Sequence, residues 1–344
     1  MQRRTERQSL HDSAKEPQAG NPGAPGSFLP TVDECIRIGG ETLSGLIFFG
    51  SQLIQSSPDA HSIADFFVIV SDYKAFYKRL RSLGQLRRPV WLVTLLNHTL
   101  PPNVLSVAST ADSPGAKGFI LSETDFTHTV SPGARDHFCR GRLSQQVRIV
   151  YARDARTRER LKENIAAARR HSLQWVPLYV NAPFSVQNYC LRMLQVSFAN
   201  EFRPESNERV LELFNKQADF FEQTYGDILA SAASTGELER QKDLYCERTQ
   251  ASAMRRLRWR WYFWRSGLRA TMRWAKYVFT FEEWLDYIVH KIERRTGMHV
   301  ELSRAERRFP LLILWPKALR VLLALRSVRK QKRPEQKVSP NAKG

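Results

Sequence analysis

The sequence is poor in the residues that build metal clusters and disulfide frameworks. Its 344 residues include four cysteines, Cys35, Cys139, Cys190 and Cys246, which are widely spaced and form no Cys-x-x-Cys pair. The eight histidines show no His-x-His or His-Glu-x-x-His spacing. These spacings indicate neither a zinc site nor a disulfide-stapled domain. A reducing compartment fits them best.

Long apolar runs are also missing. The closest candidate, residues 311–325, is interrupted by Lys317 and Arg320, whereas a transmembrane helix needs about 18 or more uninterrupted apolar residues. The N-terminus mixes basic with acidic side chains and has no apolar segment, which is typical of neither a secretory signal nor a transit peptide. The sequence therefore predicts a protein that does not cross a bilayer.

Acidic residues are scarce relative to basic ones. The chain has 34 Asp and Glu against 53 Lys and Arg, giving a formal net charge of +19. Such an excess predicts an anionic partner, which is nucleic acid, phospholipid head groups or a nucleotide. A hydrophobic content of 42% indicates a globular core. Residues 1–30, rich in Gly, Pro and Ser, are expected to be disordered.

Apolar periodicity divides the remaining chain into a mixed part and a helical part. Residues 31–153 combine short apolar runs with helical spacing, which predicts an α+β domain. Residues 154–300 carry helical patterns, and residues 301–344 form a basic amphipathic tail that ends in disorder. Helices are expected within 31–45, with a Thr-x-x-Glu cap at Thr31, and at 73–83, 156–171, 186–198 and 208–225. Strands are expected at 46–49, 66–70, 89–96, 119–121 and 147–151.

A Gly-Ser turn at Gly50 and Ser51 follows the first strand, and Asp65 directly precedes the second. Glycine lets backbone amides approach a polyphosphate closely, and the neighbouring hydroxyl adds a donor. A carboxylate on the next strand can hold Mg²⁺ against the same phosphates. The pattern resembles that of polymerase-beta-type nucleotidyltransferases. From these residues alone, a structural hairpin with a polar turn fits equally well.

Several further segments share their order and spacing with one known family. They are FFGS at 48–51, ADFFVIVSD at 64–72, LPPNVLSV at 100–107, KGFILSETDF at 117–126, FCRGRLSQQV at 138–147, SFANEFRPES at 197–206 and WRSGLRATMRWAKY at 264–277. They resemble motifs of the mitochondrial-type phosphatidate cytidylyltransferases, also called CDP-diacylglycerol synthases. The resemblance implies a polymerase-beta-type nucleotidyltransferase domain at 31–153 and a helical domain at 154–300. It also implies transfer of CMP from CTP to phosphatidic acid, which gives CDP-diacylglycerol and pyrophosphate for phospholipid synthesis.

The same resemblance implies roles for individual residues. Asp65 is expected to be catalytic and to bind Mg²⁺, with Asp125 as a second ligand. Solvated surface charge is the alternative for the basic residues, and a helix-dipole partner is the alternative for Asp125. The nucleotide is expected at Gly50, Ser51, Lys117 and Arg142, and the substrate phosphate at Arg203 and Lys276.

The sequence departs from the pattern at two places that leave other functions open. Phe67 stands where a polymerase-beta-type site places its second carboxylate, and Glu201 replaces an aspartate in the SFANEF segment. A nucleotidyltransferase acting on RNA or protein is one alternative. A catalytically inactive, membrane-associated relative is the other.

Two stretches interleave basic with aromatic and aliphatic residues, at 254–279 and 308–333. This composition suits a membrane interface, where Trp lies at the headgroup level and basic side chains meet anionic lipid. We therefore expect CTP, phosphatidic acid and an anionic membrane surface as partners, with no obligate nucleic acid. The expected location is the cytoplasmic face of a bacterial inner membrane, or alternatively the matrix side of a mitochondrial inner membrane.

Overall fold

A computed structural model describes residues 28–54, 63–107, 115–201, 205–248 and 251–280. The chain divides into two units at residue 281, and all the described residues belong to the first. The second unit, with the predicted tail at 301–344, lies outside the described residues, as do residues 1–27. Among the described helices, none has the length and apolar character needed to cross a membrane.

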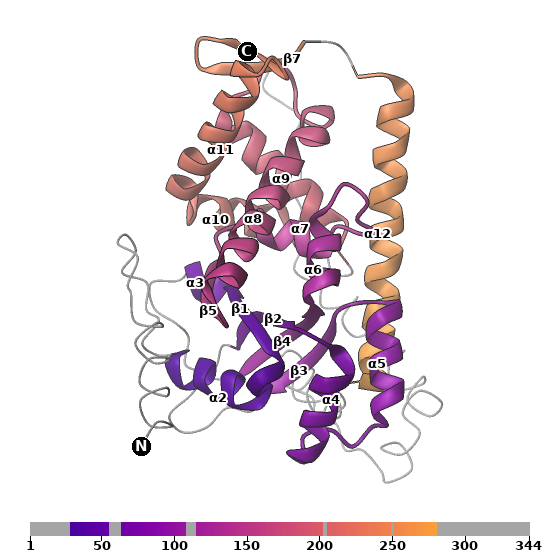
Figure 1. Cartoon of the computed structure of the whole chain (residues 1–344). Coiled ribbons are helices and arrows are strands. Elements are labelled where there is room, and N and C mark those ends of the chain that lie inside the picture. Colours follow the sequence, from indigo (N-terminus) through magenta and orange to yellow (C-terminus); the bar gives the residue numbers. More distant parts are fainter. Residues whose placement is uncertain (1–27, 55–62, 108–114, 202–204, 249–250, 281–344) are drawn as a thin grey trace, which may run out of the picture. The chain divides into compact units, whose positions relative to one another are not determined.

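Within the described residues, the larger sheet has five strands in the order β3-β4-β2-β1-β5. Strands β2 and β4 run parallel, and every other neighbouring pair is antiparallel. A mixed sheet combined with helices confirms the predicted α+β class (Figure 1). The strands are β1 (Leu43–Phe49), β2 (Ala64–Val70), β3 (Asn103–Val107), β4 (Ala116–Ser122) and β5 (Arg148–Ala152).

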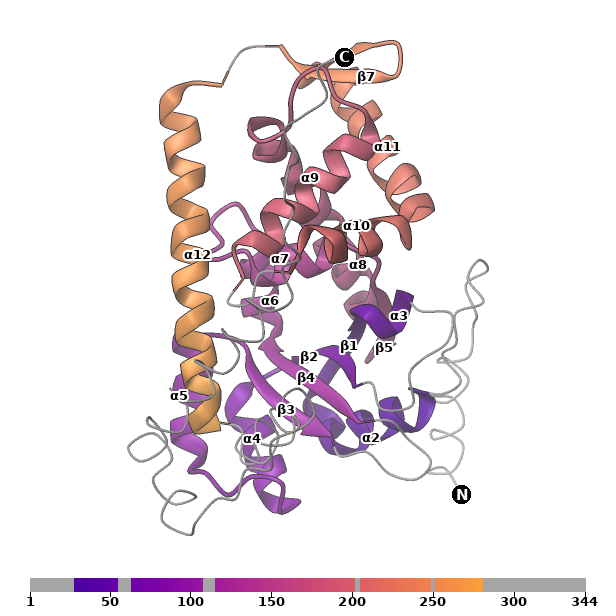
Figure 2. The same ribbon diagram turned by 180° about the vertical axis from the view of Figure 1, so that it is seen from behind.

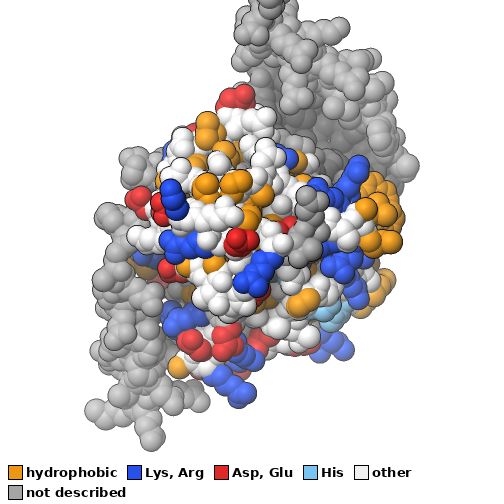
Figure 3. Space-filling model, turned by 90° about the horizontal axis from the view of Figure 1, so that it is seen from above, with side chains coloured by type: hydrophobic (Ala, Val, Ile, Leu, Met, Phe, Trp, Pro, Cys, Tyr) orange, Lys and Arg blue, Asp and Glu red, His pale blue; other side chains and the backbone are white. Residues whose placement is uncertain are grey.

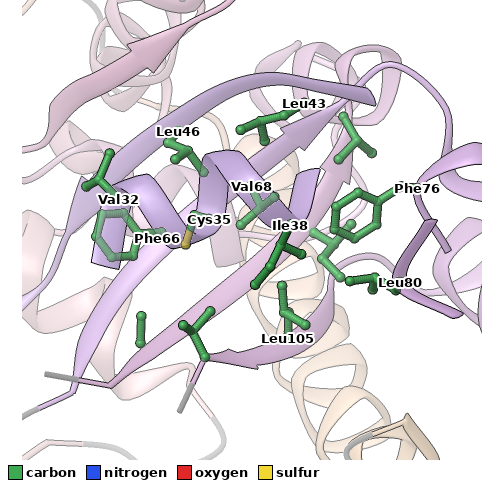
Figure 4. Close-up of a cluster of buried hydrophobic side chains, with 14 of the residues drawn as sticks. Val32, Cys35, Ile38, Leu43, Leu46, Phe66, Val68, Phe76, Leu80 and Leu105 are labelled. Carbon is green, nitrogen blue, oxygen red and sulfur yellow. The ribbon is translucent and has the colours of Figure 1, made fainter. Parts of the chain in front are cut away.

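Helices cover both faces of this sheet because its central strands are apolar on both sides. One face packs against α2 (Leu29–Gly39), α4 (Tyr73–Ser82) and α5 (Val90–Thr99). Figure 4 shows this layer, in which Cys35 from α2 lies near Phe66 from β2 and Ile38 lies near Val68. The other face packs against α6 (Glu123–Val130), α7 (Phe138–Leu143) and α8 (Ala155–Arg170). Even-numbered residues of β2 and β4 face the first layer, and odd-numbered residues face the second.

The chain passes from the hydrophobic core around the sheet to a second hydrophobic core after α8. The composition shift near residue 154 falls before α8, but Leu161 and Ile165 of that helix pack against the sheet. A second core begins at Leu173. It contains α9 (Val186–Ala199), α10 (Asn207–Asn215), α11 (Ala218–Ser234), the hairpin β6 (Leu238–Gln241) to β7 (Leu244–Glu247), and part of α12 (Ala253–Thr280).

Four secondary-structure predictions are wrong. The predicted strand 89–96 is helix α5, because a short apolar run does not by itself distinguish a buried strand from a helix. The predicted helix 208–225 is two helices, α10 and α11. The hairpin β6–β7 interrupts the part predicted to be helical. Helix α2 begins before Thr31, which is buried in its first turn and does not cap it.

A buried ionic cluster fastens α12 to the segment before α7. Asp136 Oδ2 accepts hydrogen bonds from Arg269 Nε at 2.9 Å and from Arg273 Nη2 at 2.8 Å. His137 N donates to Ser266 Oγ at 2.9 Å. Burial alone raises the pKa of Asp136, but the Arg273 and Arg269 guanidiniums outweigh burial and hold that pKa below its usual value. The carboxylate is therefore ionised and anchors α12 beside α7.

Candidate nucleotide-binding site

The Gly-Ser turn lies between the end of β1 and the short helix α3 (Ser51–Ile54). Gly50 has φ of +91°, a conformation that side chains rarely allow. The β1–β2 register places Phe49 opposite Asp65, so the turn begins beside that carboxylate. A Cβ atom on Gly50 would lie 3.1 Å from Asp65 Oδ2. The predicted juxtaposition of glycine turn and acid is therefore present.

Gly50→Ala is expected to destabilise the fold by about 1–2 kcal/mol, because at positive φ the alanine Cβ comes too close to the following backbone carbonyl oxygen. The new Cβ also displaces the Asp65 carboxylate, so nucleotide binding should fall together with stability. Gly84→Ala is the matched control, since Gly84 also has positive φ but no atom lies within 4 Å of the place that an added Cβ would take. Thermal unfolding and CTP titration of both variants would test this. Equal loss of nucleotide binding in both would contradict it.

Lys117 lies beside Asp65 on the neighbouring parallel strand. The β2–β4 register pairs these two residues directly. Both are odd-numbered, so they share the face that α6, α7 and α8 cover, together with Phe67 and Phe119. Opposite charges directly across a strand pair attract one another. The register thus joins two sequence-predicted residues that are 52 positions apart.

Arg142 reaches the same face of the sheet from α7. Its guanidinium carbon lies 3.8 Å from the centroid of the Phe138 ring, and Nη1 donates to the Phe138 carbonyl at 3.0 Å. The guanidinium also forms an ion pair with Glu201 at 3.0 Å. Because the ring and the carboxylate hold it in place, the guanidinium is oriented before any ligand arrives.

The electrostatics of Asp65 connect these groups. Burial raises the pKa of Asp65, and the nearby charges of Lys117 and Arg142 oppose that effect. An acid that is costly to ionise in the free protein gains most from an added cation. Two basic side chains, a glycine turn and the Ser51 hydroxyl together suit a polyphosphate.

The residues fit one part of a magnesium site. Mg²⁺ commonly takes one or two protein carboxylates and fills its other positions with phosphate oxygens and water. Asp65 supplies one such carboxylate. Position 67 supplies none, because it is a fully buried phenylalanine. The centroid of the Phe67 ring lies 4.4 Å from that of Phe49, on which it stacks, and 6.2 Å from that of Phe119. Within the described ranges, no group of three or more metal-ligating side chains is found.

Asp125 lies at the other end of the sheet, which corrects its prediction as a ligand shared with Asp65. It is on α6, just after Ser122, and its carboxylate accepts a hydrogen bond from Tyr73 Oη at 2.6 Å. Ser122 and Lys117 are five residues apart on β4, which corresponds to roughly 16 Å along a strand. The two carboxylates therefore cannot hold one ion.

Lys276 is also away from this group, and Arg203 is outside the described residues. Lys276 is buried on α12, where Nζ donates to the carbonyls of Leu100 and Pro102. Burial lowers its pKa to about 6, assisted by the charges of Arg273 and Arg269. These contacts give Lys276 a structural role at the chain preceding β3. That it also holds the substrate phosphate stays a prediction.

Two residues that contribute to the site were not predicted from the sequence to do so. Phe138 supports Arg142, and Glu201 pairs with it from a position 59 residues away. Glu201 stood out as the altered acid of the SFANEF segment, but no local spacing links it to α7. Its position as a charged residue inside a matched motif is the sequence feature that could have identified Glu201.

Comparison with models of known protein families found no match, and comparison with curated proteins found none either.

Proposed function

We propose that this chain is a nucleotidyltransferase that transfers CMP from CTP to phosphatidic acid at a membrane surface, forming CDP-diacylglycerol and pyrophosphate. One observation carries the proposal. Asp65, Lys117 and Arg142, taken from three separated motifs of the resemblance, meet on one face of the sheet beside the Gly50 turn.

The site's residues have distinct tasks in this reaction. Lys117 and Arg142 neutralise the triphosphate through charge-assisted hydrogen bonds, and the Ser51 hydroxyl adds a donor. Asp65 would hold Mg²⁺, which would supply positive charge to stabilise the charge that develops on the phosphates. A phosphate oxygen of phosphatidic acid bonds to the α-phosphorus of CTP. The bond from that phosphorus to the bridging oxygen breaks, and pyrophosphate leaves with the oxygen.

A single carboxylate favours a phosphate acceptor over a hydroxyl acceptor. A phosphate monoester has its second pKa near 6, so it is mostly ionised at neutral pH and needs no general base. A ribose or serine hydroxyl must lose a proton to a general base, and a second carboxylate beside Asp65 can serve as that base. Phe67 occupies the position of that carboxylate within a cluster of aromatic rings. This argument supports phosphatidic acid over RNA or protein.

The helix pair α10–α11 does not suit DNA reading by a helix-turn-helix. A helix-turn-helix inserts its second helix into the major groove, between two phosphate backbones. Helix α11 has no Lys or Arg and carries Asp219, Glu222 and Asp227. Such a helix is repelled by phosphate, so α11 does not suit the role of a recognition helix.

Helix α12 offers a surface that matches an anionic bilayer. Its exposed apolar side chains recur at intervals of three and four residues, which places them along one stripe. Exposed arginines stand beside the stripe at Arg256, Arg258 and Arg260. Figure 3 shows hydrophobic side chains next to Lys and Arg at the right of the view, where α12 lies in Figure 1. The stripe consists of Met254, Leu257, Trp261, Trp264, Leu268 and Met272.

An acceptor assay tests the proposed function. The purified full-length protein is incubated with α-labelled CTP, Mg²⁺ and phosphatidic acid in anionic vesicles, with RNA and a protein mixture as parallel acceptors. The expected result is label in the lipid phase, with one pyrophosphate released per lipid labelled. Label in RNA or protein would establish the alternative transferase. CTP binding without any transfer would establish a catalytically inactive relative.

A further inference from the structure

Helix α5 is apolar nearly all round in its first two turns, yet only two of its ten residues are buried and four more are half-buried. Its sequence is VWLVTLLNHT, and among these ten described residues Val93 and Asn97 are buried. Trp91 is 68% exposed and Leu95 52% exposed. A helix that is hydrophobic on every side is normally enclosed by protein or lipid. The outer face of α5 therefore calls for a partner.

The charge around α5 has one sign. The segment 73–107 contains no Asp or Glu, and the nearest acidic residue before it is Asp72. Arg87 and Arg88 lie just before Pro89, the N-cap of the helix, and are exposed, as are three basic residues of α4. An apolar face within a segment whose Lys and Arg have no acidic counterparts complements a surface that is both apolar and anionic. The same segment repels a basic surface. The basic residues of this segment are Lys74, Lys78, Arg79, Arg81, Arg87 and Arg88.

Helix α12 has the same chemistry and is fastened to the end of α5. It carries eight Lys and Arg and no Asp or Glu. Arg273 Nε donates to the Pro101 carbonyl at 3.0 Å, and Lys276 Nζ donates to the carbonyls of Leu100 and Pro102. Leu100 directly follows α5. Figures 1 and 2 show α5 beside the C-terminal part of α12 in opposite views. Two segments distant in sequence thus present one kind of surface side by side.

We propose that α5 and α12 form one composite docking surface for an anionic lipid bilayer. Trp91 and Leu95 enter the boundary between head groups and acyl chains, while Arg87 and Arg88 meet the lipid phosphates. The inference deepens the proposed function and rests on its membrane contact. A single amphipathic helix leaves the protein free to rock about the helix axis, whereas two contacts fix how the sheet and the Gly50 turn are presented to the lipid.

Vesicle binding of a double variant tests α5 directly. Full-length Trp91→Ser/Leu95→Ser is mixed with vesicles of phosphatidylcholine and phosphatidylglycerol, and bound protein is measured by flotation. Binding should weaken by roughly tenfold or more, because two large apolar side chains no longer leave water. Leu211→Ser/Leu244→Ser is the matched control, since these leucines are 46% and 38% exposed but lie outside α5 and α12. Its binding should match the wild type.

Two results would overturn the proposal. In the first, Trp91→Ser/Leu95→Ser binds vesicles like the wild type while Trp261→Ser/Trp264→Ser does not, so α12 docks alone. In the second, the α5 variant melts several degrees lower than the control, which means that its outer face is covered by the chain itself. CTP titration without lipid separates this proposal from the proposed function. Wild-type protein that binds CTP but no vesicles refutes the docking surface and leaves the nucleotide site standing.

Discussion

Asp65→Asn is expected to abolish nucleotidyl transfer while making the protein more stable. The amide keeps the shape of the carboxylate but loses the charge that holds Mg²⁺, which supplies several kcal/mol and hence about a thousandfold in rate. Because the pKa of Asp65 is raised in the folded state, its ionisation opposes folding. That cost appears as the pH rises from the unfolded value of 3.8 through the folded pKa. At neutral pH, the neutral amide removes it.

The transfer assay and a melting curve without metal or nucleotide measure both parts of this expectation. Asp72→Asn is a suitable control at the other end of β2, where the carboxylate caps α4. That variant should keep its activity and nearly all of its stability, because Asn caps a helix about as well as Asp. Full activity of Asp65→Asn would refute the site, and a lower melting temperature would mean that Lys117 and Arg142 require the charge for folding.

Asp136→Asn is expected to cause a large loss of stability. Removing one partner of a buried ion cluster leaves Arg269 and Arg273 without their counter-charge, which typically costs about 3–5 kcal/mol. The pKa of Asp136 is lowered from 3.8 in the folded protein. Its ionised form therefore stabilises the fold at every pH above that value, and the contribution is lost as the pH falls through the lower, folded-state pKa.

Urea unfolding at pH 7 and near pH 3 tests the Asp136 cluster. The wild type and Asp136→Asn should differ strongly at pH 7 and by less near pH 3, which lies below the unfolded-state pKa of 3.8. Asp243→Asn is the matched control, because that side chain is 99% exposed and lies 3.9 Å from Arg240. It should change the free energy of unfolding by less than about 1 kcal/mol. A difference that persists unchanged at low pH would contradict the ionic account.

The centre of the candidate site was readable from the sequence because it depends on local order. A glycine that ends one strand and an acid that starts the next are brought together by any antiparallel pairing of those strands, as Gly50 and Asp65 are. Lys117 and Arg142 required more, since their position depends on the β2–β4 register and on the packing of α7. The family resemblance selected them, and the structure brings both near Asp65.

Other parts could not be read locally because tertiary packing decides them. The apolar run that forms helix α5 is equally compatible with a strand, and only its packing between α4 and β3 decides for the helix. Lys276 looks like any basic residue of an amphipathic helix until α12 packs against the carbonyls before β3. Asp125 lies beyond the far end of β4 from the paired site, a separation that no motif encodes.

The most direct test of the nucleotide site is equilibrium binding of CTP, without lipid, to wild-type protein and to Lys117→Met. The account predicts binding by the wild type and roughly 10- to 100-fold weaker binding by the variant, because a charge-assisted hydrogen bond contributes about 1.5–3 kcal/mol. Lys162→Met, an exposed lysine paired with Glu159 on α8, should bind CTP like the wild type. Equal affinity of all three proteins, or no binding by any, would contradict the account.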